Sequence, residues 1–446
     1  MFPITMNSPV EHHGPLPKAA EVVIIGGGVI GVSAAYYLAR AGVSVVLLEK
    51  GRIAGEQSSR NWGWIRQQGR DLAELPIMIE ANQLWREIAA DLDEDIGLAT
   101  CGLTYLTNDE AETARYEDWL KDAVPMGVDS RVLSGREIET LLPGMTKPYA
   151  AALHTPSDMK AEPWVAVPAI ARAAARHGAV IVEQCAAQVL EREGGKVSGV
   201  QTEQGPIRAG EVIVAGGAWS SLFLRNEGVD IPQLSVRATV AATGPLPEVH
   251  GGGAVGDSLA FRRRQDGGYT LAASGYHEIF VGFDAFRHAT KYLPQLRRSP
   301  FMRAYRPRAP EAGYPDGWGT KRRWDGSSTS PFEAQRILDP APNAGKVAEI
   351  RAAFESLFPA LGEVRIADSW AGMIDTMPDI VPVVDRAPVS GLSICTGMCG
   401  HGFGIGPAFG RIMADMVMGN DIGHDMRRFR FGRFSDGSRL ELGPDL

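Results

Sequence analysis

The chain has 446 residues and a formal net charge of −8, and 44% of its residues are hydrophobic and 22% charged. This length favours two domains, and the composition is that of an ordinary globular protein. The negative charge argues against a general nucleic-acid-binding protein. The four cysteines form no CxxC pair and no metal-ligand cluster, so we expect no metal site and free thiols in a reducing compartment; they are Cys101, Cys185, Cys395 and Cys399.

The first 20 residues contain Pro, His and Gly and lack the apolar core of a secretory signal, so we expect a flexible leader over 1–20. No window of the sequence reaches the roughly 18 uninterrupted apolar residues that a membrane span requires. We therefore expect no transmembrane segment and a cytoplasmic protein.

The stretch Val22–Glu49, VVIIGGGVIGVSAAYYLARAGVSVVLLE, predicts a strand, a helix and a second strand around a GxGxxG motif. Gly26 permits a tight turn, Gly28 lets the backbone approach a pyrophosphate, and Gly31 lets the helix pack close to the sheet. The helix N-terminus favours phosphates. Glu49 can accept hydrogen bonds from a ribose, so the unit predicts a dinucleotide site.

Apolar periodicity predicts further elements along the chain. Ser134 and Glu137 form a Ser-x-x-Glu capping box. The expected helices are Pro76–Leu92, Glu110–Val124, Pro163–His177 and Pro407–Met418. The expected strands are Gly102–Thr107, Ala151–His154, Val180–Glu183, Gln188–Glu193, Lys196–Glu203, Val212–Ala215, Arg365–Gly372, Ile380–Val384 and Leu392–Thr396, with further β-structure over Val236–Phe283.

A second glycine-rich turn, Gly397–Gly406, precedes the last of these helices. A glycine-rich turn before a helix lets the backbone approach a ligand closely, here near the far end of the chain. Such a layout favours FAD over NAD, because in two-domain FAD proteins the first and last segments share the flavin domain and the substrate domain is inserted between them.

The segment Phe283–Pro342 is rich in Arg, Pro and Gly. It is interpreted as a solvated, irregular insertion, an active-site lid, or a docking surface for an acidic partner or a membrane face. Its basic clusters are Arg297-Arg298, Arg303–Arg308 and Lys321-Arg322-Arg323.

The chain resembles the FAD-dependent D-amino-acid oxidase, glycine oxidase and sarcosine oxidase superfamily over essentially its full length. The motifs that carry the resemblance are VVIIGGGVIGVSAAYYLARAG, VSGVQTEQGPIRAGEVIVAGGAWS, WAGMIDTMPDIVPVVD and GHGFGIGPAFGRIMADMVMG. Within the superfamily it is most similar to bacterial L-amino-acid deaminases and soluble L-amino-acid oxidases, through LLEKGRIAGEQSSR, SPFEAQRILDPAPN and ADMVMGND.

This resemblance implies an α/β fold in which a Rossmann-like FAD domain, split in sequence, is joined to an α+β substrate domain with an antiparallel sheet. The expected FAD domain comprises 21–75, 151–235 and 363–446. The expected substrate domain comprises 76–150 and 236–362, with the basic insertion at about 283–342.

The resemblance also assigns the flavin site. The implied FAD-binding residues are Gly26, Gly28, Val29, Ile30, Gly31, Glu49, Lys50, Gln57, Ser58, Ser59, Arg60, Gly63, Trp64, Ala187, Ala215, Gly216, Trp219, Gly402, Phe403 and Gly404. Trp64 could equally be a core aromatic. Relatives that attach FAD covalently use a cysteine or a histidine, which WAGMIDTMPD and GEQSSRNWGW lack, so we expect noncovalent FAD.

The implied activity is oxidative deamination of a free L-amino acid, with a hydrophobic or aromatic side chain, to a 2-oxo acid and ammonia. A hydride passes from Cα to flavin N5, O2 reoxidises the flavin to give H2O2, and no strong general base is obligatory. The alternatives are a D-amino acid or a secondary amine of the sarcosine or hydroxyproline type, and a dehydrogenase that passes electrons to a carrier. The enzyme could act as a homodimer.

The deaminases carry two features that this sequence lacks, an N-terminal membrane segment and a substrate-binding arginine at a position that falls near Ser274. Another residue must then recognise the substrate carboxylate, and arginine suits this role. Arg66 is the first candidate, although it could pair with Asp71 or Glu74 instead. Arg322, Arg262–Arg264 and His401 are further candidates, the histidine as a donor or merely as a turn residue.

Overall fold

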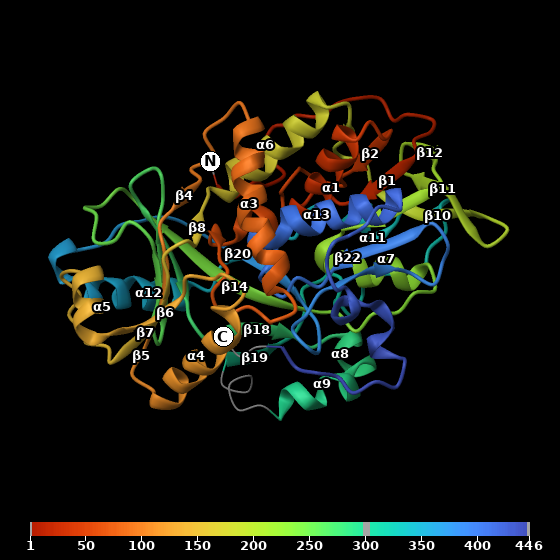
Figure 1. The fold of residues 1–446 in the computed structure, drawn as a ribbon. Coiled ribbons are helices and arrows are strands. Elements are labelled where there is room, and N and C mark those ends of the chain that lie inside the picture. Colours follow the sequence, from red (N-terminus) through yellow and green to blue (C-terminus); the bar gives the residue numbers. More distant parts are fainter. Residues whose placement is uncertain (1, 298–303, 444–446) are drawn as a thin grey trace.

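The computed structural model describes residues 2–297 and 304–443, and Figure 1 shows its arrangement around two large sheets. The first has six strands in the order β21-β22-β13-β1-β2-β9, all parallel except β21. Its strands are β1 (Val22–Ile25), β2 (Val45–Leu48), β9 (Val180–Val182), β13 (Glu211–Val214), β21 (Val383–Arg386) and β22 (Leu392–Thr396). The first segment, the middle and the last segment of the chain therefore build one sheet, as expected for a split nucleotide-binding domain.

Helices α1 and α13 come from opposite ends of the chain and lie side by side against this sheet (Figure 1). The approach is close: a Cβ atom on Gly410 would lie 2.3 Å from the Ser33 Cβ, and one on Gly406 would lie 2.7 Å from Val29. The helices of this domain are α1 (Val29–Arg40), α2 (Gln57–Arg60), α3 (Leu75–Asp91), α6 (Pro163–Arg176), α7 (Ser220–Asn226) and α13 (Gly402–Met418).

The last helix was expected to start at Pro407 after a glycine-rich turn, and this expectation is wrong. The helix begins at Gly402, so Gly402, Gly404 and Gly406 form its first two turns. These glycines provide close packing rather than a turn, since a Cβ atom on Gly404 would lie 3.1 Å from the backbone of Ile65.

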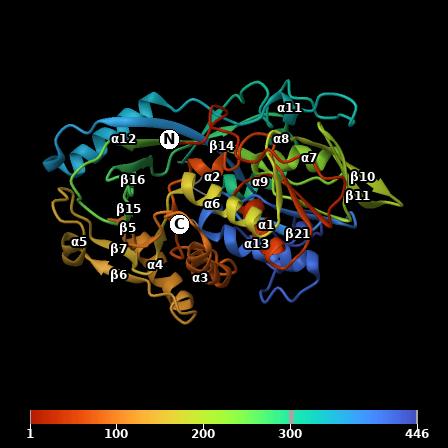
Figure 2. The same cartoon turned by 90° about the horizontal axis from the view of Figure 1, so that it is seen from above.

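The second sheet is mixed and mostly antiparallel, in the order β19-β18-β14-β17-β16-β15-β5-β7-β6, with β20 paired to β14. Figure 2 shows it beside the nucleotide-binding sheet, with α12 on it. Its strands are β5 (Leu103–Thr107), β6 (Arg131–Ser134), β7 (Ala151–Thr155), β14 (Leu234–Thr243), β15 (Gly253–Val255), β16 (Leu259–Arg263), β17 (Tyr269–Ala273), β18 (His277–Phe280), β19 (Tyr305–Arg308) and β20 (Ile366–Thr376).

Two of the segments expected in the FAD domain contain strands that belong to this second sheet. Residues 151–155 and 366–376 were assigned to the FAD domain, but β7 pairs with β5 and β6, and β20 pairs with β14 along its whole length. Helix α3 was assigned to the substrate domain, yet it packs against α13. Alternating apolar residues predict a strand without indicating which sheet it joins.

The remaining elements are short or peripheral. The hairpin expected around Gly194-Gly195 and the capping box of Ser134 and Glu137 are confirmed. The elements are β3 (Trp64–Ile65), β4 (Ala99–Thr100), β8 (Met159–Lys160), β10 (Ala187–Glu193), β11 (Lys196–Thr202), β12 (Gly205–Arg208), α4 (Glu110–Ala123), α5 (Gly135–Leu141), α8 (Phe283–Arg287), α9 (Ala289–Leu296), α11 (Pro331–Ala334), α12 (Ala344–Leu357), η1 (Gly217–Trp219), η2 (Pro359–Leu361), η3 (Arg427–Phe429) and η4 (Phe431–Phe434).

The leader is irregular but packs on the nucleotide-binding domain, contrary to the expected flexible extension. The Ile4 N–H donates to Ser59 Oγ at 3.2 Å, and the Arg52 guanidinium donates to the Ser8 carbonyl at 2.8 Å. The composition of the leader conceals these contacts because they are made mainly by its backbone. Within the described ranges no helix is long and apolar enough to cross a bilayer.

Candidate functional site

A cavity of about 450 Å³ lies between the carboxyl ends of the parallel strands and one face of the second, ten-stranded sheet, which is called the large sheet below. Glycine-rich segments after β1 and β13, the loop 54–64 and the start of α13 line one part of it. Residues of β14, β17, β18 and β20 line the other part. Ligands of open α/β sheets bind at this edge.

The glycine motif leaves space at the N-terminus of α1. A Cβ atom on Gly26, whose φ is +114°, would lie 2.4 Å from the Ala215 carbonyl oxygen, and one on Gly31 would lie 1.9 Å from the Gly26 oxygen. A Cβ atom on Gly28 would meet only the Ser58 hydroxyl, at 3.1 Å. The first turn of α1 carries no acidic residue. The Val29 N–H donates to Ser58 Oγ at 2.9 Å, whereas helix geometry gives the N–H groups of Ile30 and Gly31 no acceptor within the helix, so the residues present fit a pyrophosphate.

Glu49 ends the βαβ unit at the edge of the cavity. Its carboxylate accepts hydrogen bonds from the N–H groups of Gly27 at 2.8 Å and Gly51 at 2.6 Å. These contacts fix the carboxylate beside the glycine turn, where it can accept from a ribose hydroxyl.

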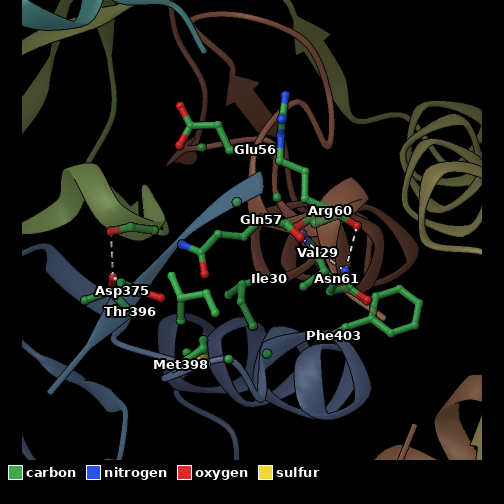
Figure 3. A pocket seen from close by; sticks show the side chains of 18 of the residues that line it. Val29, Ile30, Glu56, Gln57, Arg60, Asn61, Asp375, Thr396, Met398 and Phe403 are labelled. Atoms are coloured by element: carbon green, nitrogen blue, oxygen red, sulfur yellow. Dashed lines mark hydrogen bonds between the residues drawn. The ribbon is translucent and has the colours of Figure 1, made fainter. Parts of the chain in front are cut away.

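The loop before Trp64 faces the start of α13 across the cavity (Figure 3). Gln57 points toward Asp375 and Thr396 in this view. Asp375 is buried, which raises the pKa of its carboxyl, and accepts from the Gly397 N–H at 2.7 Å. This amide-rich wall can hydrogen-bond the polar middle of a dinucleotide.

Two of the expected cofactor residues have charged side chains that pair with other groups of the protein. Arg60 lines the cavity, but its guanidinium points away from α13 (Figure 3) and pairs with Asp339 at 2.7 Å. Lys50 pairs with Glu56 at 2.8 Å and lies 4.6 Å from the Trp219 ring centroid. These residues shape the wall of the cavity.

The structure brings most of the expected cofactor residues to this one cavity. Three of them do not line it. Gly31 instead provides the close approach to Gly26, Ser59 accepts from Ile4, and Gly63 turns beside Ala161. Those that line it are Gly26, Gly28, Val29, Ile30, Glu49, Lys50, Gln57, Ser58, Arg60, Trp64, Ala187, Ala215, Gly216, Trp219, Gly402, Phe403 and Gly404.

Comparison with known proteins identifies this arrangement. The family model described as FAD dependent oxidoreductase (DAO) matches residues 21–416. The chain belongs to the DAO family of FAD-dependent oxidoreductases. FAD is therefore its cofactor, and the family acts on amino-acid or amine substrates.

The similar proteins include L-amino acid deaminases and a sarcosine oxidase subunit. The chain is similar in structure to L-amino acid deaminase from Proteus myxofaciens, with a TM-score of 0.90, 30% identity and 96% of each chain covered. L-amino acid deaminase from Proteus vulgaris also gives 0.90 and 30%, covering 95% of this chain and 99% of that one. In sequence, sarcosine oxidase subunit beta from Arthrobacter sp is 25% identical over 440 residues, 96% of this chain and 94% of the relative.

In this DAO-family enzyme Arg66 lines the cavity just after β3. Its guanidinium lies 5.5 Å from the Tyr105 ring centroid and donates to the Gln68 carbonyl. Within the part of the chain that the structure describes, Arg66 forms no ion pair. The expected competitors have other partners: Glu74 pairs with Arg70 and Asp71 with Arg428.

Arg66 is held by contacts on both sides. The buried Asp158 carboxylate accepts from the N–H groups of Gln67 at 2.7 Å and Gln68 at 3.4 Å. Arg70 donates to the Arg66 carbonyl at 3.1 Å and to the His401 carbonyl at 3.2 Å. The segment that carries Arg66 is therefore fixed to the first turn of α13.

His401 lines the cavity as the N-cap residue of α13. Burial holds the pKa of its imidazole well below the usual range, and the charges of Arg70 and Arg66 lower it further. Its buried Nδ1 has no hydrogen-bond partner among the described residues. A neutral imidazole can donate or accept one hydrogen bond toward a ligand.

The other candidate arginines lie elsewhere, which corrects those expectations. Arg322 is outside the cavity because its guanidinium pairs with the buried Asp284 at 3.1 Å. Arg262 is fully buried against Glu162. Arg263 and Arg264 donate to the carbonyl oxygens of 246, 269 and 243. Position in a basic or strand-like segment does not reveal a buried acidic partner.

Trp64 lines the cavity and also packs with Leu103 and Ala260 in the core. Sequence reasoning missed other lining residues, among them Arg70, Tyr105, Ala238 and His277. His277 is three residues after Ser274, near which the resemblance led us to look for a substrate-binding arginine.

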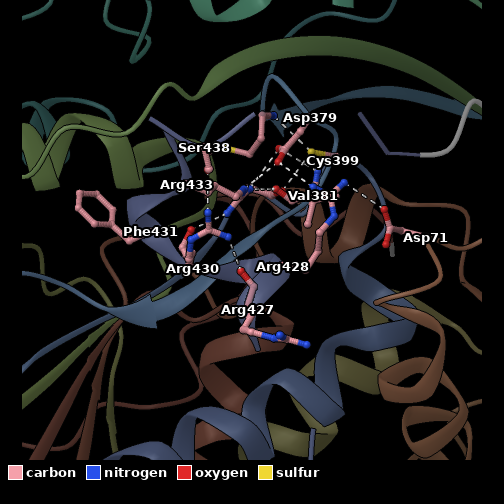
Figure 4. A network of polar contacts seen from close by, with 12 residues as sticks. Asp71, Asp379, Val381, Cys399, Arg427, Arg428, Arg430, Phe431, Arg433 and Ser438 are labelled. Carbon is pink, nitrogen blue, oxygen red and sulfur yellow. Dashed lines mark hydrogen bonds and ion pairs between the residues drawn. The ribbon is translucent and has the colours of Figure 1, made fainter. Parts of the chain in front are cut away.

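A buried polar network joins the C-terminal segment to the turn after β20 (Figure 4). The fully buried Asp379 accepts from the Arg433 guanidinium at 2.7 and 3.1 Å, and Arg428 lies 3.7 Å from the same carboxylate. Arg428 also contacts Asp71 at 3.2 Å. The C-terminal 3₁₀ segments are thus tied to the turn after β20 and to the segment before α3.

The described residues of the basic insertion form regular secondary structure and ion pairs rather than an irregular, solvated loop. β19 adds a strand beside β18, and Arg308 pairs with Glu278 at 2.8 Å. Arg323 donates to the Arg225 carbonyl at 2.8 Å. Arg298 and Arg303, which belong to the predicted basic clusters, lie outside the described residues.

Proposed function

We propose that this enzyme oxidises the Cα–N bond of a free L-amino acid to the imine, which water hydrolyses to a 2-oxo acid and ammonia, and that O2 is the final electron acceptor. One observation carries the proposal: Arg66 faces the cavity without an acidic partner among the described residues. An unpaired guanidinium inside a largely buried cavity is suited to bind a substrate carboxylate bidentately.

Bound FAD supplies the hydride acceptor. The protein orients the substrate: Arg66 binds the carboxylate, and the face of Tyr105 keeps the guanidinium in place. Neutral His401 can hydrogen-bond the amine without repelling it. The small apolar residues Ala238, Val240 and Ala273 line the cavity.

The structural similarity to two L-amino acid deaminases supports this substrate class. Noncovalent FAD is part of the same proposal. So is an L-amino acid with a hydrophobic or aromatic stem, since most residues on the large-sheet side of the cavity are apolar.

The sequence similarity to sarcosine oxidase subunit beta favours a second candidate, an N-methyl amino acid. Arg66 would serve it equally well, because both substrates carry a carboxylate. Anaerobic bleaching of the flavin separates them in a panel of L- and D-phenylalanine, L-proline and sarcosine. Bleaching by L-phenylalanine alone is the expected result, whereas bleaching by sarcosine or D-phenylalanine alone would overturn the first proposal.

The acceptor needs its own assay. Stoichiometric H2O2 with the 2-oxo acid is expected for O2 as acceptor. Rapid dye reduction without peroxide would show instead a dehydrogenase that passes electrons to a carrier.

A further inference from the structure

The strand that faces β14 is interrupted where it borders the cavity. Seven residue steps separate Ala272 from Ile279, whereas only four separate their partners on β14, Val240 and Val236. Three extra residues, 274–276, therefore bulge out between β17 and β18. Bulges beside active sites redirect side chains.

His277 is the first residue after this bulge. It continues the pairing of Glu278 with Arg237 and so lies across from Ala238, and both His277 and Ala238 line the cavity. Its ring packs against Tyr305, with 5.3 Å between the centroids. The buried Nδ1 has no hydrogen-bond partner among the described residues.

The imidazole is uncharged at neutral pH because burial lowers its pKa to about 4. A neutral imidazole carries one N–H donor and one acceptor nitrogen. A buried polar atom without a partner costs stability unless a ligand satisfies it. His277 thus presents an unsatisfied hydrogen-bonding atom beside the substrate space.

Arg66 and Tyr105 lie at the opposite side of this space. β16 and β15 separate β17 from β5, which carries Tyr105. Three strand spacings amount to about 14 Å between backbones. Between the two polar groups the lining is apolar, with Val240, Ala273 and Val255.

We propose that His277 is a specificity-determining residue that hydrogen-bonds a polar group at the far end of the substrate side chain. The preferred substrate is then an L-amino acid with an aromatic or apolar stem that ends in a hydrogen-bonding group, such as the phenol of L-tyrosine. This inference rests on the proposed oxidation of L-amino acids with the carboxylate at Arg66.

L-Tyrosine and L-phenylalanine form a matched pair that differs only in the terminal hydroxyl. Phenylalanine leaves the buried imidazole nitrogen unpaired, so we expect kcat/KM for tyrosine to exceed that for phenylalanine about tenfold. In His277→Leu the ratio should fall to about one. His277→Asn, whose amide can occupy the Nδ1 position, should retain part of the preference.

The control variant is His250→Leu. His250 is also buried, burial lowers its pKa to about 4 as well, and it does not line the cavity. This variant should keep the wild-type ratio. An unchanged ratio in a flavin-loaded His277→Leu enzyme would overturn the inference.

A second measurement needs no variant. The unreactive analogues 3-phenylpropanoate and 3-(4-hydroxyphenyl)propanoate can be titrated into the wild-type holoenzyme and followed by the flavin absorbance. The hydroxylated analogue should bind about tenfold more tightly, and equal dissociation constants would contradict the role of His277. If neither L-amino acid is oxidised while sarcosine is, the proposed function fails; if both are oxidised at equal kcat/KM, only the specificity inference fails.

Discussion

Arg262 and Glu162 form a bidentate ion pair inside the protein, with nitrogen–oxygen distances of 3.1 and 2.9 Å. Glu162 is the N-cap residue of α6 in the nucleotide-binding domain, and Arg262 belongs to β16 of the large sheet. The pair joins α6 to the large sheet and lies beside Gly63, where a Cβ atom would be 3.0 Å from the guanidinium carbon. It therefore also supports the turn that leads to Trp64.

Replacing Glu162 by Gln should strongly destabilise the protein. The change leaves the Arg262 charge buried without its partner, which costs about 3–5 kcal/mol. Denaturant unfolding of the holoenzyme measures the effect. The control is Asp118→Asn, which breaks an exposed pair with Lys121 and should change stability by less than about 1 kcal/mol. Equal stability of the two variants would contradict the expected role of the buried pair.

Replacing Arg66 by Met should lower kcat/KM about 100-fold, because the substrate carboxylate loses its charged, bidentate partner. Arg66→Lys should recover part of the loss, since a lysine retains the charge without the planar fork. Steady-state 2-oxo acid formation provides the measurement. Arg263→Met, which removes an arginine outside the cavity, serves as the control. Wild-type kinetics in Arg66→Met would exclude this residue as the carboxylate partner.

Gly31→Val should abolish FAD binding while leaving much of the large sheet intact. A Cβ atom at this position would lie 1.9 Å from the Gly26 carbonyl oxygen, so the glycine turn and α1 must separate. The flavin-to-protein absorbance ratio of the purified protein gives the loading. Gly210→Ala is a suitable control because a Cβ atom there would meet nothing within 4 Å. Full loading of the valine variant would contradict the close-packing role of Gly31.

Asp158 should make stability depend on pH. Burial raises the pKa of its carboxyl to about 7 from the ordinary value of 3.8. Between these values the folded state keeps a proton that the unfolded state has lost, so the contribution of this group to stability falls as pH rises from about 4 to about 7.

Asp158→Asn cannot titrate in this way. The difference in unfolding midpoint between variant and wild type should therefore move in favour of the variant as pH rises through this window, and become constant above about pH 8. Urea unfolding at one-unit pH steps measures it. A difference that does not change with pH would show that Asp158 has an ordinary pKa in the folded protein.

Acid precipitation should release all FAD into the supernatant. The expected attachment motifs contain no cysteine or histidine. In WAGMIDTMPD, which includes part of β20, the sulfur-containing side chains are methionines such as Met373. Cys395 and Cys399 do line the cavity, and burial raises the pKa of both thiols, which disfavours the reactive thiolate. Flavin fluorescence of the washed pellet is the test, and a labelled pellet would establish a covalent bond.

The local elements and the dinucleotide site were predictable because they depend on short-range patterns. GxGxxG with Glu49 predicted β1, α1 and β2, and strand periodicity predicted most of the remaining strands. Sheet membership was less predictable: β20 pairs with β14 across more than 120 residues of intervening chain, and the periodicity of a strand does not specify its partner.

The substrate side of the cavity was predictable only in part. Arg66 was found because it follows the flavin loop, whereas Arg322 was wrongly placed because its partner Asp284 is distant in sequence. His277 could not be selected by spacing alone. Its importance depends on the bulge at 274–276 and on an unpaired nitrogen, and both are tertiary features.

The contact between α1 and α13 limits when the enzyme can acquire its flavin during synthesis. α1 ends at Arg40, but it requires the glycine face of a helix that is made more than 350 residues later and ends at Met418. Contacts between such distant segments form late, and the ribosome must release α13 before they can form. A nascent chain should therefore remain colourless until α13 has left the ribosome, and any truncation before Gly402 should yield a protein that cannot hold FAD.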